Sequence, residues 1–152
     1  MPAKAHSHSL RSGRVSVPGQ VYLVTTRLIN GRRTFANWQL GRLVVDELRL
    51  AHEKKIVHSL AWVVMPDHLH WLFELRDGRL ASVMQRVKSR SSIALNRATG
   101  NSGRVWQTGY HDIAIRQEKN LINFARYIVA NPLRAGLVNN VGEYPLWDCK
   151  WL

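Results

Sequence analysis

A hairpin in the middle of the chain is the feature that most constrains the fold. Residues 56–65 (IVHSLAWVVM) form a strongly apolar run, and residues 68–75 (HLHWLFEL) form a second one. Pro66 and Asp67 stand between them, and this pair breaks a strand and favours a turn. Because so short a turn joins only antiparallel strands, the sequence predicts that the two runs are neighbours in an antiparallel sheet.

Helical and strand patterns flank this hairpin on both sides. The expected helices span residues 38–55, 80–98 and 118–131, and the expected further strands span residues 20–27 and 111–116. Pro132 ends or kinks the third helix, and the tail after it is expected to be irregular. The resulting order predicts an α+β ferredoxin-like sandwich, in which an antiparallel sheet carries its helices on one face.

The length of the chain suits one domain with one hydrophobic core. We expect residues 19–152 to form that domain and residues 1–18 to be a flexible basic N-terminal arm, which lacks the apolar segment of a secretory signal. No apolar run approaches the roughly 20 residues that a membrane span needs. Because Cys149 is the single cysteine, no intrachain disulfide can form. These features favour the cytoplasm and predict no membrane partner.

The charge of the chain is the first indication of function. It has 22 Lys and Arg residues against 10 Asp and Glu residues, a formal net charge of +12. Such an excess attracts polyanions, of which the DNA backbone is the commonest, and it predicts association with the bacterial nucleoid. The alternative is an ordinary basic protein from a GC-rich genome, in which Arg replaces Lys.

Four arginines of the second expected helix form a stripe. Arg79, Arg86, Arg90 and Arg97 fall within about 20° of one line on a helical wheel. No acidic residue lies between Arg79 and Arg97, whereas an ordinary solvated face usually mixes charges of both signs. The stripe therefore predicts contacts with phosphates.

The loop after this helix adds basic and aromatic side chains, and Trp106 in it could stack on an unpaired base. Tyr110 and His111 could form a second pair of nucleophile and base, but no helix fixes their direction. The residues expected to contact DNA are Arg79, Arg86, Lys88, Arg90, Arg97, Arg104, Trp106, Gln107, Tyr110 and Arg134.

The second strand of the hairpin opens with two histidines. His68 and His70 point to the same face of that strand, while Leu69 and Trp71 point to the other face. Imidazole is the commonest side-chain ligand of zinc, manganese and related divalent ions. The pattern is consistent with a metal site, and equally with two polar residues on an open sheet face.

The third expected helix carries a polar face around Tyr127. Asn120, Asn123, Asn131 and Arg134 fall within about 45° of Tyr127 if the helix continues past Pro132. The apolar stripe lies to one side of this face, whereas a core tyrosine would lie within that stripe. Tyr127 is therefore a candidate functional residue, and Asn131, one turn later, could offer its carbonyl oxygen to a metal.

An ordered series of motifs covers residues 19–148 and resembles the REP-associated tyrosine transposases, relatives of the single-tyrosine insertion-sequence transposases in the HUH nuclease superfamily. The matching segments are GQVYLVTTR (19–27), AWVVMPDHLHWLFEL (61–75), VKSRSS (87–92), VWQTGYHDIAIR (105–116), YIVANPLRAGLV (127–138) and EYPLW (143–147).

The resemblance implies a role for particular residues. His68 and His70 would hold a catalytic divalent ion, Mg²⁺ or Mn²⁺, with Asn131 as a further ligand, and Tyr127 would be the nucleophile. The implied substrate is single-stranded or hairpin DNA from repetitive extragenic sequences, cleaved and rejoined through a 5′-phosphotyrosine intermediate. Whether the protein is a monomer or a homodimer stays open.

Two other functions compete with that of a metal-dependent DNA endonuclease and strand transferase. A DNA-binding protein without cleavage, such as a repressor of its own repeats, would need the arginine stripe but not His68, His70 and Tyr127 together. An RNA-binding module would need exposed aromatic side chains on the sheet face, where this sequence has two histidines instead.

Overall fold

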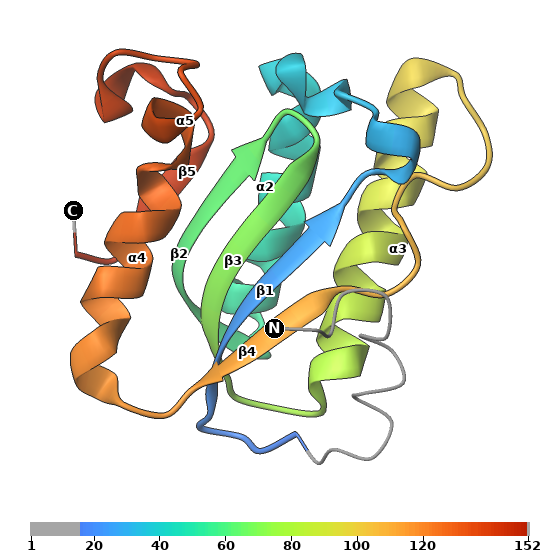
Figure 1. Cartoon of the computed structure of the whole chain (residues 1–152). Coiled ribbons are helices and arrows are strands. Elements are labelled where there is room, and N and C mark those ends of the chain that lie inside the picture. Colours follow the sequence, from blue (N-terminus) through green and yellow to red (C-terminus); the bar gives the residue numbers. More distant parts are fainter. Residues whose placement is uncertain (1–15, 152) are drawn as a thin grey trace.

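A five-stranded antiparallel sheet forms the centre of the computed structural model, which describes residues 16–151 (Figure 1). The strand order is β4-β1-β3-β2-β5. The strands are β1 (Val21–Arg27), β2 (Val57–Met65), β3 (His68–Leu75), β4 (His111–Ile115) and β5 (Trp147–Cys149). The helices are α2 (Trp38–Glu53), α3 (Leu80–Thr99), α4 (Leu121–Val129) and α5 (Asn131–Arg134).

The central hairpin forms as its sequence predicts. β2 and β3 pair antiparallel from Met65 opposite His68 to Val57 opposite Leu75, with one irregularity between Ser59 and Ala61. The turn is Pro66 and Asp67. Because the strand register follows from this short turn, the hairpin also decides which side chains of β3 face each side of the sheet.

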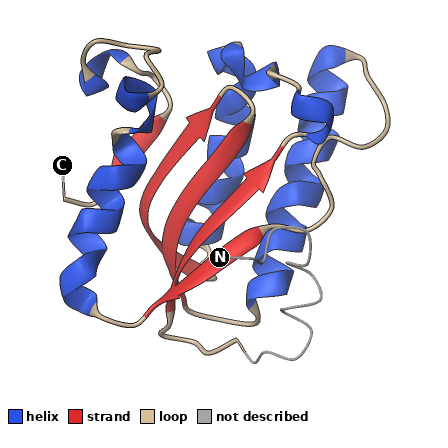
Figure 2. Ribbon diagram, viewed as in Figure 1, coloured by secondary structure: helices blue, strands red, loops and turns tan. Residues whose placement is uncertain are grey.

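Helices cover both faces of the sheet (Figure 2). The two long helices, α2 and α3, bury apolar side chains against one face, together with Leu69 and Trp71 of β3. The short α4 packs its buried Ala125 and Ile128 against the opposite face, where Leu72 lies. The α+β class and the antiparallel sheet are confirmed. The single helical face of the prediction describes α2 and α3 but not α4. The reason is that β2 carries apolar residues on both of its faces, so both sides of the sheet need cover there.

The third expected helix is divided into short pieces. A 3-10 turn (Glu118–Asn120) leads into α4, which ends at Val129, and α5 begins at Asn131 with Pro132 buried inside it. The break at Ala130 precedes the proline, in agreement with the steric restriction that proline places on earlier residues. The tail is less irregular than expected, because β5 pairs with Ala61–Val63 of β2.

The expected flexible arm falls almost wholly on residues 1–15, which lie outside the described residues, as does residue 152. Of its last residues, Ser16 accepts a hydrogen bond from the backbone N–H of Leu80 at 3.0 Å, at the start of α3. Among residues 16–151, no helix combines the length and the apolar character that crossing a bilayer requires.

Gly41 lets α2 approach the segment that leads into β5. A Cβ atom added at Gly41 would overlap Cδ1 of Leu146, which is fully buried, and would also touch Val64. We expect Gly41→Ala to lower the free energy of unfolding by about 1–3 kcal/mol through overpacking, although alanine is the better helix former. Urea unfolding followed by circular dichroism measures this change. Arg42→Ala, at the exposed neighbouring position, is the control, and a Gly41→Ala protein as stable as this control would contradict the prediction.

Candidate active site

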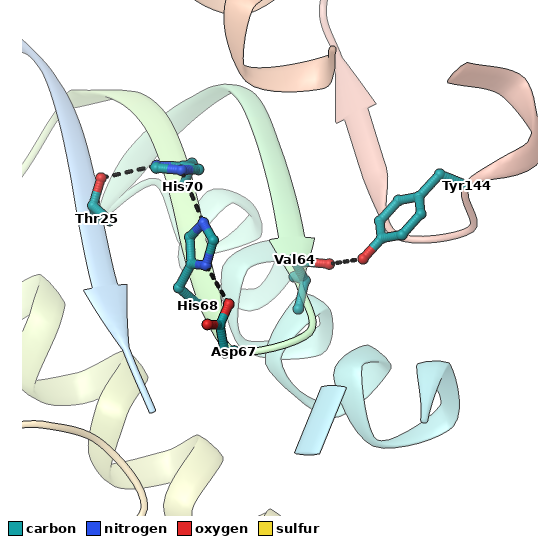
Figure 3. A network of polar contacts seen from close by, with 6 residues as sticks. All are labelled: Thr25, Val64, Asp67, His68, His70 and Tyr144. Atoms are coloured by element: carbon teal, nitrogen blue, oxygen red, sulfur yellow. Dashed lines mark hydrogen bonds and ion pairs between the residues drawn. The ribbon is translucent and has the colours of Figure 1, made fainter. Parts of the chain in front are cut away.

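Strand β3 presents His68 and His70 together on the sheet face that α4 partly covers. Their Nε2 atoms lie 3.1 Å apart, and the rings meet edge to face with centroids 4.7 Å apart. Figure 3 shows the two imidazoles next to each other along the strand, with their rings nearly perpendicular. The two side chains therefore lie in contact on one face of the sheet, as the alternation of the strand predicted.

Two further side chains hold the outer nitrogens of these rings. The Nδ1 of His68 lies 2.6 Å from Oδ1 of Asp67, and the Nδ1 of His70 lies 2.8 Å from Oγ1 of Thr25 (Figure 3). Since a carboxylate only accepts, His68 carries its proton on Nδ1, and its Nε2 is the acceptor in the contact with Nε2 of His70. Ligating histidines in metal sites are oriented in this way by partners on the opposite ring nitrogen.

Burial keeps both histidines neutral at pH 7. It lowers the pKa of His70 to about 3, and the nearby charges of His68, Arg27 and Arg134 lower it further. Burial also lowers the pKa of His68, although the hydrogen bond and the charge of Asp67 oppose this shift. Neutral imidazole is the form that binds metals, and a metal held by both Nε2 atoms would displace the one proton that lies between them.

The residues of the third helix that the sequence singled out come together next to this pair. Tyr127 is 58% exposed, and the guanidinium carbon of Arg134 lies 3.9 Å from the centre of its ring. Arg134 also donates to the carbonyl oxygen of Tyr127 at 2.7 Å and to Oδ1 of Asn131 at 3.0 Å. The charge of Arg134 contributes to the lowered pKa of His70, and α4 packs on the sheet face that carries the two histidines. The helix break at Ala130 does not separate Tyr127, Asn131 and Arg134.

The donor set fits a metal only if a further oxygen joins the two histidines. Among residues 16–151, no group of three or more His, Cys, Asp or Glu side chains could hold a metal ion. The carboxylate of Asp67 is turned to the Nδ1 side of His68, away from the point where the Nε2 atoms meet. An amide oxygen, such as that of Asn131, is then the side-chain candidate for a third ligand, and it suits Mg²⁺ or Mn²⁺.

The structure adds two facts about the arginine stripe on α3, whose predicted contacts with phosphates stay a prediction. The helix packs on the sheet face opposite to the one that carries His68 and His70, so the stripe is not part of this site. Arg90 also has an acidic partner, because its Nε lies 2.7 Å from Oε1 of Glu47 on α2. Arg79 and Arg97 are exposed, while Arg86 is half-buried.

The loop of residues 100–110 packs against the rest of the domain, so its aromatic rings are not available to stack on DNA bases. Trp106 is only 3% exposed, donates from Nε1 to Oγ of Ser91 at 3.0 Å and packs on Phe35. Tyr110 is 7% exposed. The expectation that Trp106 stacks on a base and that Tyr110 meets DNA is therefore corrected, because both rings belong to the core.

Polar residues of the same region have partners within the protein. Lys88 donates from Nζ to the carbonyl oxygens of Gln107 and Gly109, both at 2.7 Å, and Arg104 donates to the hydroxyl of Thr108. The backbone N–H of Gln107 donates to the carbonyl oxygen of Arg27 at 2.8 Å, while its side chain is exposed. The bonds of Lys88 join the loop to α3, and the bond of Gln107 joins it to the end of β1.

Thr25 and Asp67 are the site residues that the sequence did not single out. Asp67 appears in the sequence as half of a turn signal, and its place directly before His68 was the available indication of a second role. Thr25 lies 45 positions from His70 and meets it only through the pairing of β1 with β3. That pairing has no local signal in the sequence.

The antiparallel sheet with its paired histidines and the helix with an exposed tyrosine agree with a protein of the transposase class. Residues 22–131 match the sequence model of the family described as "Transposase IS200 like", and the chain belongs to this family.

Within this family the chain is similar to the REP-associated tyrosine transposases. It is 25% identical to the REP-associated tyrosine transposase of Escherichia coli K12 over 134 residues, which are 87% of this chain and 78% of that protein. A Haemophilus influenzae protein named for the same group is 28% identical over 116 residues, 66% of each chain. The solved structure of a REP-associated tyrosine transposase bound to a REP hairpin superposes with a TM-score of 0.73 at 25% identity, covering 88% of this chain and 79% of that one.

Proposed function

We propose that this protein is a metal-dependent endonuclease and strand transferase that acts on single-stranded DNA of hairpin-forming repeats. The observation that carries the proposal is the contact between the Nε2 atoms of two neutral histidines on the sheet face against which α4, the helix of the exposed Tyr127, packs. The REP hairpin bound by the similar solved transposase supports hairpin DNA as the substrate class. A hairpin of this kind offers unpaired nucleotides next to a duplex stem.

Tyr127 is the proposed nucleophile. Its hydroxyl oxygen attacks a backbone phosphorus, the bond from phosphorus to the 3′ oxygen breaks, and the products are a 5′-phosphotyrosine and a free 3′-hydroxyl end. The phosphotyrosine bond conserves the energy of the phosphodiester, so a second 3′-hydroxyl can reverse the reaction without ATP. The exposure of Tyr127 allows a DNA strand to reach its ring.

The two histidines and Asn131 are the proposed holders of a Mg²⁺ or Mn²⁺ ion. Such an ion supplies charge stabilisation at the attacked phosphate, where negative charge builds up during the displacement. His68 and His70 keep their Nε2 atoms aimed at one point, and Asp67 and Thr25 prevent their rings from turning away. Arg134 fixes the position of Asn131 relative to the Tyr127 ring.

A direct test uses labelled oligonucleotides. The protein is incubated with single-stranded hairpin repeats in the presence of Mg²⁺ or Mn²⁺, and the products are separated on a denaturing gel. We expect a covalent protein–DNA conjugate together with a shortened strand that ends in a 3′-hydroxyl. Tight binding without conjugate or cleavage would instead identify a DNA-binding protein that does not cut.

The α3 stripe leads to a prediction about affinity. We expect Arg97→Ala to weaken binding of all single-stranded and hairpin sequences alike, and to reduce the slope of log Kd against log salt concentration by about one. Arg90→Ala should change the slope less, because Glu47 already neutralises part of that charge. Fluorescence anisotropy titrations at several salt concentrations measure both slopes. Equal slopes for the wild type and the Arg97→Ala protein would assign the stripe to a solvated surface.

A further inference from the structure

Arg27, the last residue of β1, stands beside the two histidines and has no assigned role. We propose that its guanidinium binds the phosphate that Tyr127 attacks, from the side of the site opposite to α4. The proposal deepens the function proposed above and rests on it. It makes Arg27 a catalytic residue that contacts the reacting phosphate, in addition to the residues that hold the metal.

The strand register places Arg27 on the correct face. In the antiparallel pairing of β1 with β3, Arg27 lies opposite His68, and Thr25 lies opposite His70. Directly opposed residues in an antiparallel pair point to the same side of the sheet, with Cβ atoms about 5 Å apart. The hydrogen bond between Thr25 and His70 across this pairing shows that side chains on this face of β1 and β3 are in contact. The longer side chain of Arg27 therefore extends past His68 on the same face.

The charge of Arg27 acts on this site. It contributes to the lowered pKa of His68, of His70 and of Asp67, in agreement with the position of Arg27 opposite His68 in the strand register. The side chain is exposed, and no carboxylate among residues 16–151 lies within 4.0 Å of it. Asp67, the nearby acid, is hydrogen-bonded to His68 instead.

The second guanidinium at the site is in a different situation. Arg134 donates to the Tyr127 carbonyl and to Asn131, and its guanidinium lies over the Tyr127 ring. The hydrogen bonds of Arg134 therefore stabilise the segment that carries Tyr127 and Asn131. Arg27 keeps its donors available, while the bond from Gln107 N–H to its carbonyl oxygen holds its backbone. A planar guanidinium with a fixed backbone suits two oxygens of one phosphate, and it is more effective there than a lysine.

The experiment compares Arg27→Gln and Arg27→Lys with Arg76→Gln, which removes the same charge at the far end of β3. After the cleavage position has been mapped with the wild type, each protein binds two oligonucleotides in EDTA. One is native, and the other carries an uncharged methylphosphonate at the mapped position. We expect this replacement to weaken binding roughly tenfold for the wild type and Arg76→Gln, but not for Arg27→Gln. We also expect conjugate formation by Arg27→Gln to slow by roughly 10²–10³-fold.

Each outcome has a distinct meaning. A methylphosphonate effect that persists in Arg27→Gln would overturn the proposal, even if cleavage were slow, because Arg27 would then not touch that phosphate. If the wild type forms no conjugate, the proposed function fails and this inference fails with it. If circular dichroism shows that Arg27→Gln does not fold, Arg27→Lys becomes the deciding variant. The Arg27→Lys protein should retain most of the methylphosphonate effect yet form the conjugate more slowly. Conjugate formation by Arg27→Lys at the wild-type rate would overturn the proposal.

Discussion

Tyr127→Phe is expected to form no covalent conjugate with single-stranded hairpin DNA, a complete loss of the reaction rather than a slower rate. The change removes the single oxygen that would bond to phosphorus and leaves the rest of the ring in place. Because Tyr127 is 58% exposed, no large cavity forms, and the free energy of unfolding should change by less than about 0.5 kcal/mol. Denaturing gels detect the conjugate, and peptide mapping locates the modified residue.

Tyr110→Phe is the matched control for this variant. Tyr110 was the rival nucleophile on sequence grounds, but it is only 7% exposed. We expect its phenylalanine variant still to form the conjugate. DNA binding by Tyr127→Phe should equal that of the wild type, because the proposed phosphate contacts come from other residues. A conjugate that persists in Tyr127→Phe, or one that maps to Tyr110, would refute the assignment.

Loss of the paired histidines is expected to abolish cleavage while preserving most of the DNA affinity. His68→Ala or His70→Ala removes one of the two converging nitrogens, and EDTA removes the ion itself. Charge stabilisation by such an ion amounts to several kcal/mol, so the rate of conjugate formation should fall by more than about a thousandfold. Manganese binding, followed by the electron paramagnetic resonance signal of free Mn²⁺, should weaken in parallel.

His58→Ala provides the control for these variants. His58 also lies near a second histidine, with its ring 5.4 Å from that of His52, but it stands at the other end of β2. Its removal should leave manganese binding and cleavage unchanged. Wild-type cleavage in excess EDTA would show that the reaction does not depend on a divalent ion, and the histidines would then need another explanation.

The local elements of this fold could be predicted from the sequence because their signals are local. The alternation in residues 68–75 gives both the strand and the shared face of His68 and His70, as β3 confirms. The helical wheel around Tyr127 correctly separated it from the apolar residues of the same helix, and the structure leaves Tyr127 exposed. The short turn before His68 gave the antiparallel pairing of β2 and β3.

Contacts between distant segments could not be predicted in the same way. The pairing of Thr25 with His70 and the ion pair of Arg90 with Glu47 each join elements whose relative placement has no local signature. Trp106 seemed available for stacking because its neighbours are polar, yet it pairs with Leu28 in a β-bridge and enters the core. The near-continuous apolar character of β2 was the signal that a helix would also cover the second face.

The short turn at Pro66 and Asp67 has a consequence for how such proteins can diverge. Successive residues of β3 alternate between the buried core and the histidine face, so a deletion or insertion of one residue in this turn would exchange the two sets. Leu69 and Trp71 would face outward and both imidazoles would enter the core. Length changes among the exposed residues 100–103 should therefore be tolerated far more readily than at this turn, where the loss or gain of a single residue would disrupt both the core and the histidine pair.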